Sequence, residues 1–301
     1  MPPNRGIPLL SAPHILFDRK LLRARQRRAR HSGAEAFLLE RAAEDLFERL
    51  GTIARKFSRA AVIDTPEAEN LKTKLPASGR VETADILAID DETEVVSGDP
   101  AAYDLAVSLL SMQWLNDLPG VLAQIRRILK PDGLLLAAMI GGDALTELRD
   151  ALASAESETE GGISPRVSPF VEVRTLGSLL QRAGLALPVT DIDRVTVRYA
   201  NAFELMRDLR RMGAANALTE RSRKPLKRTT LLRAAEIYRE RYASEDGRIR
   251  ATFEILWLSG WVPHESQQQP LRPGSAKTRL ADALRAVELP AGDKTGRKKN
   301  E

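Results

Sequence analysis

Apolar positions in the first 50 residues recur every three or four residues, which is the spacing of one face of an α-helix. The first such stretch contains Leu21 and Leu22. The second contains Phe37, Leu38, Ala42, Leu46 and Leu50. The pattern predicts two consecutive amphipathic helices. Their arginines either are solvated on a helical lid or form a face for an anion or a partner, and the pattern leaves both interpretations open.

The pattern changes at Ala60, where short and nearly continuous apolar runs begin. These runs are "AAVID" (60–64), "YDLAVSLLSM" (103–112) and "GLLLAAMI" (133–140). Continuous apolar strands are typical of a parallel sheet that is buried on both faces. The segment between the last two runs predicts a helix that begins at Pro119 and ends in a turn at 131–133. The result is a strand–helix–strand crossover, which is the unit of an α/β fold.

The second half of the chain predicts another such unit with a helical insert. A helix closing at Gly184 precedes the strand-like "VTDIDRVTVRYAN", and two helices follow. We expect these to form an insert at 202–245. In "RIRATFEILWLSGW" every second residue is apolar, so we expect an edge strand that returns to the sheet. One side of this strand carries Ile249, Ala251, Phe253, Ile255 and Trp257.

The domain organisation follows from these patterns. Residues 1–50 are predicted to be a basic N-terminal helical segment, and 51–267 the α/β domain with its insert. The polar tail 268–301 is predicted to be disordered.

Composition excludes several classes of site. The chain has no cysteine, which excludes disulfides, zinc ribbons, iron–sulfur ligation and thiol nucleophiles. Its three histidines lack metal-ligand spacing, so no metal site is expected. The apolar runs are shorter than the roughly 20 residues that span a bilayer. We expect a soluble protein with at most peripheral membrane association. The first thirty residues have no long apolar run, so we do not expect a secretory signal, although their arginines are also typical of an organelle transit peptide.

The positive charge does not point to nucleic acid. The net charge is +5, with 46 basic residues against 41 acidic ones. No aromatic residue interrupts the basic runs "RKLLRARQRR" and "RSRKPLKR", so they offer no stacking platform for bases. Nucleic-acid binding would require both runs to share one face, and we do not expect it.

Several blocks resemble a known family. The segment "SMQWLNDLPGVLAQIRRILKPDGLLL" is typical of a class I S-adenosylmethionine-dependent methyltransferase domain. The blocks "FDRKLLRARQRRA", "AAMIGGDALTELRDAL", "EGGISPRVSPF", "FELMRDLRRMG" and "GWVPHESQQQP" resemble the respiratory complex I assembly factor 5 family. They resemble more distantly the malonyl-acyl-carrier-protein methyltransferases of biotin synthesis. The resemblance covers most of residues 14–276.

The resemblance implies a fold, a cofactor and a partner. The fold is Rossmann-like, with a mostly parallel sheet, N-terminal helices and a helical insert before the last strand. The cofactor is S-adenosylmethionine, and the partner is a protein client among the complex I subunits. The mitochondrial member is associated with hydroxylating an arginine of an iron–sulfur subunit. The expected location is the cytoplasm in a bacterium or the matrix side of the mitochondrion in a eukaryote.

The cofactor loop departs from the family pattern. Methyltransferases follow the first strand with an acid and three glycines, because the backbone turns sharply and approaches the cofactor there. Aligning this pattern on Asp64 puts Pro66, Ala68 and Asn70 at the glycine positions. The residues instead favour a capped helix start, with Asp64 or Thr65 as the N-cap.

The early half of the domain is short. Tyr103 follows Asp64 by 39 positions, which leaves little room for two further strands and their helices. We expect one short strand ending at Asp85, which resembles the family's ribose-binding acid. Asp90 or Asp91 resembles the acid that meets the adenine amine. Each of the three has an alternative interpretation as a solvated loop acid, which the usual exposure of charged residues favours.

The remaining candidates lie near strand ends, where open α/β sheets bind ligands. Met112, Gln113 and Trp114 follow the second apolar run, as candidates for cofactor contacts. Trp114 either stacks on a substrate or cofactor or is simply packed.

Other substrate candidates follow the next run. Gly141 and Gly142 permit either close approach to a ligand or tight packing, and Asp143 is predicted to cap the next helix. Arg166, in a loop with the make-up of a lid, is a candidate for an anionic group.

No catalytic group is clear from the sequence. His264 and Glu265 are weak candidates for a general base, and a structural role explains a lone histidine equally well. Two hypotheses therefore stand: an enzyme with S-adenosylmethionine in the strand-end cleft, and a cofactor-free assembly chaperone that keeps the fold.

Overall fold

The computed structural model describes residues 15–267. Of these, residues 15–264 belong to one compact unit. The predicted tail at 268–301 lies outside the described residues. Among the helices of residues 15–267, none combines the length and hydrophobicity that a membrane crossing needs.

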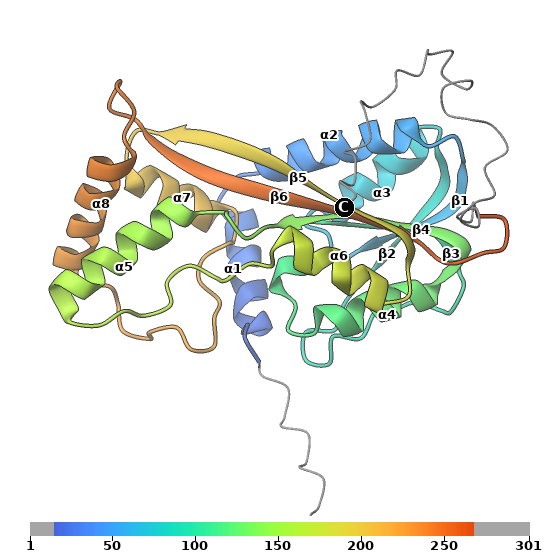
Figure 1. The fold of residues 1–301 in the computed structure, drawn as a ribbon, viewed down its shortest axis with the longest axis horizontal. Coiled ribbons are helices and arrows are strands. Elements are labelled where there is room, and N and C mark those ends of the chain that lie inside the picture. Colours follow the sequence, from blue (N-terminus) through green and yellow to red (C-terminus); the bar gives the residue numbers. More distant parts are fainter. Residues whose placement is uncertain (1–14, 268–301) are drawn as a thin grey trace, which may run out of the picture. The chain divides into compact units, whose positions relative to one another are not determined.

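A six-stranded sheet organises the described part of the chain (Figure 1). Its strands are β1 (Phe57–Ile63), β2 (Val81–Leu87), β3 (Tyr103–Leu109), β4 (Leu129–Ile140), β5 (Ala186–Tyr199) and β6 (Ile249–Trp261). The spatial order is β2-β1-β3-β4-β6-β5. The first four strands in this order run parallel, and β6 runs antiparallel to both β4 and β5. This arrangement confirms the predicted α/β fold with a mostly parallel sheet.

Helices cover both faces of the sheet. They are α1 (Arg19–His31), α2 (Phe37–Thr52), α3 (Ala68–Ala77), α4 (Leu118–Ile128), α5 (Thr146–Glu160), α6 (Val173–Arg182), α7 (Ala202–Arg211) and α8 (Arg228–Tyr242), with a 3-10 turn at Met112–Trp114. Alternate residues of β1 point to opposite faces, so Val62 packs with α2 and α3, whereas Ile63 packs with α4 and α6.

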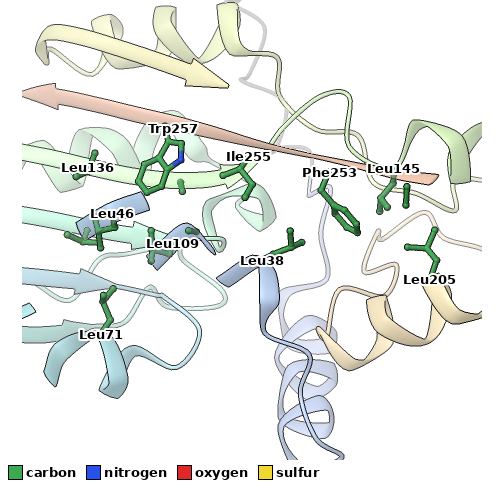
Figure 2. Packing of buried hydrophobic residues seen from close by; sticks show 14 of the residues in the cluster. Leu38, Leu46, Leu71, Leu109, Leu136, Leu145, Leu205, Phe253, Ile255 and Trp257 are labelled. Atoms are coloured by element: carbon green, nitrogen blue, oxygen red, sulfur yellow. The ribbon is translucent and has the colours of Figure 1, made fainter. Parts of the chain in front are cut away.

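The helical insert lies between β5 and β6, as predicted. Its helices α7 and α8 pack with α5 beside the part of the β5–β6 strand pair where β5 ends and β6 begins (Figure 1). Leu145, Leu205 and Phe253 join this part to the sheet in one continuous apolar core (Figure 2).

The position of β6 corrects one prediction. The strand is not at the edge, because it pairs with β4 on one side and β5 on the other. The edge strand is β5. The predicted shared side of β6 is confirmed, since its five alternate apolar residues all enter the core with α2.

The segment between β1 and β3 is short, as predicted. Among the described residues it holds one strand, β2, and a single antiparallel bridge between Ile89 and Val96. Strand β2 runs to Leu87, so the predicted end at Asp85 is two residues too early. The turn predicted at 131–133 lies instead within the first part of β4.

The helix start predicted after β1 is wrong. Helix α3 begins at Ala68, and its N-cap residue Glu67 has a left-handed conformation without a side-chain cap. The Thr65 hydroxyl donates to the carbonyl of Ile63 at 3.2 Å and accepts from the amide of Leu109 at 3.0 Å. The Asp64 carboxylate pairs with arginines of α1. Both side chains are thus engaged by tertiary partners.

Candidate functional site

A cavity of about 640 Å³ opens at the carboxyl ends of β1, β3 and β4. Its floor consists of residues that directly follow or end these strands. They are Pro66, Glu67, Leu110, Gln113, Trp114 and Ile140. Open α/β sheets bind ligands at this edge, because the loops that leave parallel strands converge there.

The walls come from α1, α2, α5, α7, β6, the loop between α5 and α6 and the segment between α7 and α8. They are mostly apolar, and Leu38, Phe170 and Phe253 contribute to them. Gly213 lets α1 approach the end of α7, since a Cβ there would lie 2.8 Å from the Cα of Gln26 and its φ is +72°. The sequence predicted an ordered lid in the α5–α6 loop, and this loop does line the cavity.

Gln113 and Trp114 lie in the cavity floor. Trp114 is largely buried and meets the edge of Phe17 with ring centroids 5.5 Å apart. The side-chain amide of Gln113 donates to the carbonyl of Leu110 at 2.8 Å. Its Oε1 is buried without a hydrogen-bond partner among the described residues. Met112 is absent from the cavity lining and packs in the core with α4 and α6.

The loop after β1 keeps left-handed turns without glycine. Asp64 has φ +48° and Glu67 has φ +52°. A residue with a Cβ pays about 1–2 kcal/mol for this conformation, so tertiary contacts must hold the loop in place.

Arginines of α1 bind the loop acid. The Nη2 of Arg19 lies 3.4 Å from Asp64 and 3.2 Å from Asp91, and its Nε lies 3.7 Å from Glu94. Arg23 contacts Asp64 as well and lies 2.9 Å from Asp91. The side chain of Arg19 is only 2% exposed. Ion pairs therefore hold helix α1 against the segments that follow β1 and β2.

The protonation of this cluster reflects its burial. Burial raises the pKa of the Asp64 carboxyl and outweighs Arg23 and Arg19, which lower it. Burial lowers the pKa of Arg23, but Asp64 and Asp91 together raise it above its ordinary value. The cluster thus places charge where solvent is largely excluded.

The described residues at this loop do not fit S-adenosylmethionine. Pro66 has no amide hydrogen to offer, and side chains stand at all three glycine positions. The carboxylate of Asp64 is already engaged by Arg19 and Arg23.

The other predicted cofactor acids also have local partners. Asp85 lies inside β2 and pairs with Arg59 of β1 at 2.6 Å. Asp90 accepts hydrogen bonds from the amides of Glu92 and Thr93 and from the Thr93 hydroxyl, chiefly through Thr93, and these lower its pKa. Neither acid lines the cavity.

Close packing explains one of the two glycines after β4. A Cβ on Gly141 would lie 2.5 Å from Leu256, whereas one on Gly142 would make an ordinary contact at 3.4 Å from Glu172. The predicted cap at Asp143 is wrong, because α5 begins at Thr146 without a side-chain cap. Asp143 instead pairs with Arg194 at 2.6 Å.

Arg166 does line the cavity and meets an internal anion. Its guanidinium lies 2.6 Å from the Glu156 carboxylate. Burial opposes ionisation of Glu156, yet hydrogen bonds from Ser164 and Arg166 lower its pKa overall.

His264 lies far from the cavity along the sheet. It follows Trp261, which pairs with Leu134 near the start of β4, whereas the cavity lies at the other end of β4. His264 and Glu265 are exposed, and neither is part of the cavity lining. The expectation of a general base at this position is not met by the geometry. Within residues 15–267, no group of three or more metal-ligating side chains is arranged to hold a metal ion.

The charged cluster of Arg19, Arg23 and Glu94 was not among the predicted site residues. A signal was available, since "FDRKLLRARQRRA" contains both arginines in a block that resembles the family. Glu94 had no such signal, because its partners are distant along the chain. It accepts hydrogen bonds from the amides of Asn116 at 2.8 Å and Asp117 at 2.7 Å.

Comparison with known proteins decides the family. The sequence matches the methyltransferase domain family over residues 24–188. It is 42% identical over 246 residues to the arginine-hydroxylase NDUFAF5, mitochondrial, of Homo sapiens, covering 81% of this chain and 71% of that protein. The chain belongs to the NDUFAF5 family. The predicted resemblance is confirmed.

Other relatives extend the comparison. The Danio rerio NDUFAF5 is 49% identical over 187 residues, 62% of this chain and 58% of the relative. A malonyl-[acyl-carrier protein] O-methyltransferase of Laribacter hongkongensis is 36% identical over 173 residues, 58% of this chain and 56% of the relative. Across five NDUFAF5 proteins, the matching part spans 47–71% of the relative's length.

Among solved structures, a putative methyltransferase of Bacillus halodurans matches with a TM-score of 0.45 and 13% identity. The match covers 73% of this chain and 98% of that chain. The YcgJ protein of Bacillus subtilis matches with a TM-score of 0.46 and 10% identity, over 75% of this chain and 99% of that chain.

Proposed function

We propose that this chain acts in the assembly of respiratory complex I by binding a segment of a complex I subunit in the strand-end cavity. The segment carries the arginine that becomes hydroxylated. Arginine hydroxylation is the activity in the names of the chain's NDUFAF5 relatives. The observation that carries the proposal is an open, mostly apolar cavity at the substrate edge of a fold that belongs to this family.

The lining of the cavity suits a protein segment. Apolar walls from helices, strand β6 and the α5–α6 loop bury side chains, and Trp114 and Phe170 offer aromatic surface for a flat group such as a guanidinium. The proposal places no methyl transfer here, because the loop after β1 does not fit S-adenosylmethionine. The proposed site of action is the matrix side of the mitochondrion or the bacterial cytoplasm.

Deletion of the gene in its source organism tests this function. We expect loss of assembled complex I on native gels and loss of a hydroxyarginine, detected by mass spectrometry, from an iron–sulfur subunit. Wild-type protein restores both. The Ala34→Trp variant, which places a large side chain in the cavity lining, is expected to restore neither.

A matched control separates cavity filling from general damage. Ala77 is exposed at the end of α3 and does not line the cavity, so Ala77→Trp is expected to restore both readouts. Normal complex I in the deletion strain would contradict the proposed function. Assembly restored without hydroxyarginine would favour the cofactor-free chaperone instead.

A further inference from the structure

The cavity walls carry an excess of positive charge. Seven arginines and two glutamates line it within the described part of the chain. Three of these arginines are neutralised internally. Their partners are Glu156 for Arg166, Glu35 for Arg211 and Asp18 for Arg221, at 2.6, 3.5 and 3.5 Å.

Four of the lining arginines have no carboxylate partner within residues 15–267. They are Arg25, Arg30, Arg210 and Arg223. They come from α1, from α7 and from the segment between α7 and α8, so the two basic runs of the sequence meet at one cavity. Within the described part of the chain, Arg25 alone among the four has a side-chain hydrogen bond, to the carbonyl of Asn216. These four are available to anionic groups of a ligand.

The electrostatics of Arg25 agree with an uncompensated positive wall. Burial lowers its pKa, the neighbouring Arg221 lowers it further, and the carboxylate of Asp18 offsets only part of this shift. A carboxylate from outside would relieve this repulsion.

The floor of the same cavity favours a hydrogen-bond donor and a positive charge, whereas the walls favour an anion. The Oε1 of Gln113 accepts no hydrogen bond from residues 15–267, and the residue is 8% exposed. Its Nε2 donates to the carbonyl of Leu110, so Oε1 is the end of the amide that lacks a partner. The carboxylate of Glu67 also belongs to the floor. A buried acceptor without a partner calls for an N–H donor from a ligand.

We propose that the cavity selects a protein segment with a guanidinium at its tip and carboxylates beside it. Gln113 Oε1 accepts a hydrogen bond from the guanidinium, and the four unpaired arginines pair with the flanking carboxylates. This inference rests on the proposed function and adds the sequence context of the modified arginine.

The floor distinguishes this ligand from a simple anion. A phosphate backbone or an anionic lipid would satisfy the arginines but would bring negative charge toward Glu67 and leave Gln113 Oε1 unpaired. A segment with both charges satisfies the floor and the walls together.

Affinity selection from a random peptide library with a fixed central arginine tests whether the wall arginines select acidic residues. We expect the purified protein to enrich peptides with Asp or Glu near the arginine. The double variant Arg30→Glu and Arg223→Glu is expected to lose this preference, since both side chains are exposed and can be reversed without unfolding. The control is the double variant Arg27→Glu and Arg28→Glu. These two arginines also lie on α1 but do not line the cavity, so this variant is expected to keep the preference for acidic peptides.

A second measurement tests the floor. Gln113→Met is expected to weaken binding of the best selected peptide by about tenfold, because a hydrogen bond to a charged donor is lost. The same variant is expected to bind the peptide with norleucine in place of arginine as wild type does. Thermal unfolding of the variant checks that it is folded.

Several outcomes would overturn the inference. They are no enrichment of any peptide, enrichment without acids, an unchanged preference in the double variant, and equal effects of Gln113→Met on both peptides. Variant-sensitive binding to phosphatidylglycerol vesicles without acidic peptides would assign the walls to a membrane. None of these results depends on the deletion phenotype, so a failure of this inference is distinguishable from a failure of the proposed function.

Discussion

Replacing Arg19 by methionine is expected to lower the free energy of unfolding by about 3–5 kcal/mol, the range for breaking a buried ion pair. Its side chain is 2% exposed and lies among the carboxylates of Asp64, Asp91 and Glu94. Methionine fills similar space but leaves these acids with less compensation. Urea denaturation followed by circular dichroism measures the change.

Arg27→Met is the matched control, because Arg27 lies on the same helix but is exposed. It is expected to change stability by less than about 0.5 kcal/mol, as is usual for surface substitutions. Equal stability of the Arg19 and Arg27 variants would show that α1 is not fastened through this cluster.

Calorimetric titration of the folded protein with S-adenosylmethionine is expected to give no binding heat even at millimolar ligand. The three glycine positions hold Pro66, Ala68 and Asn70, and the Asp64 carboxylate is already paired. A ligand would have to displace arginines from a buried carboxylate and approach a backbone screened by side chains.

A methyltransferase with an intact glycine loop, titrated in the same buffer, serves as the positive control. Arg23→Met, which removes one of the two arginines at Asp64, is expected to gain no binding, since the loop side chains remain. Micromolar binding to the wild-type chain would show that the loop accepts the cofactor despite its side chains.

The sheet was predictable because its central strands are buried on both faces. The nearly continuous apolar runs of β1, β3 and β4 indicate this burial in the sequence. The interior position of β6 was not, because polar residues such as Arg250 and Thr252 alternate with apolar ones there. Alternation reports which faces of a strand are covered, whereas pairing at its edges depends on backbone groups of distant segments.

The loop after β1 shows how tertiary contacts override a local preference. "DTPE" favours a helix cap, yet the carboxylate of Asp64 forms ion pairs with α1 and the helix starts later. Arg19 and Arg23 contact Asp64 from 45 and 41 positions away, and no local pattern reports either contact.

The candidate site was predictable where strand ends alone decide it. Gln113 and Trp114 reach the cavity because they follow a parallel strand. Asp85 does not, since the strand continues two residues further, and His264 does not, since β6 runs in the opposite direction. Strand boundaries and directions are tertiary facts that composition does not contain.

Site-specific photo-crosslinking from the cavity tests the central claim, that this cavity is where a complex I subunit binds. The photoreactive p-benzoylphenylalanine replaces Phe170 in the cavity wall or, as the control, Ala77 outside it. After irradiation in cells, mass spectrometry identifies the partners. A complex I subunit crosslinked from position 170 and absent from position 77 is the expected result. No such subunit at position 170, or equal capture from both positions, would contradict the claim.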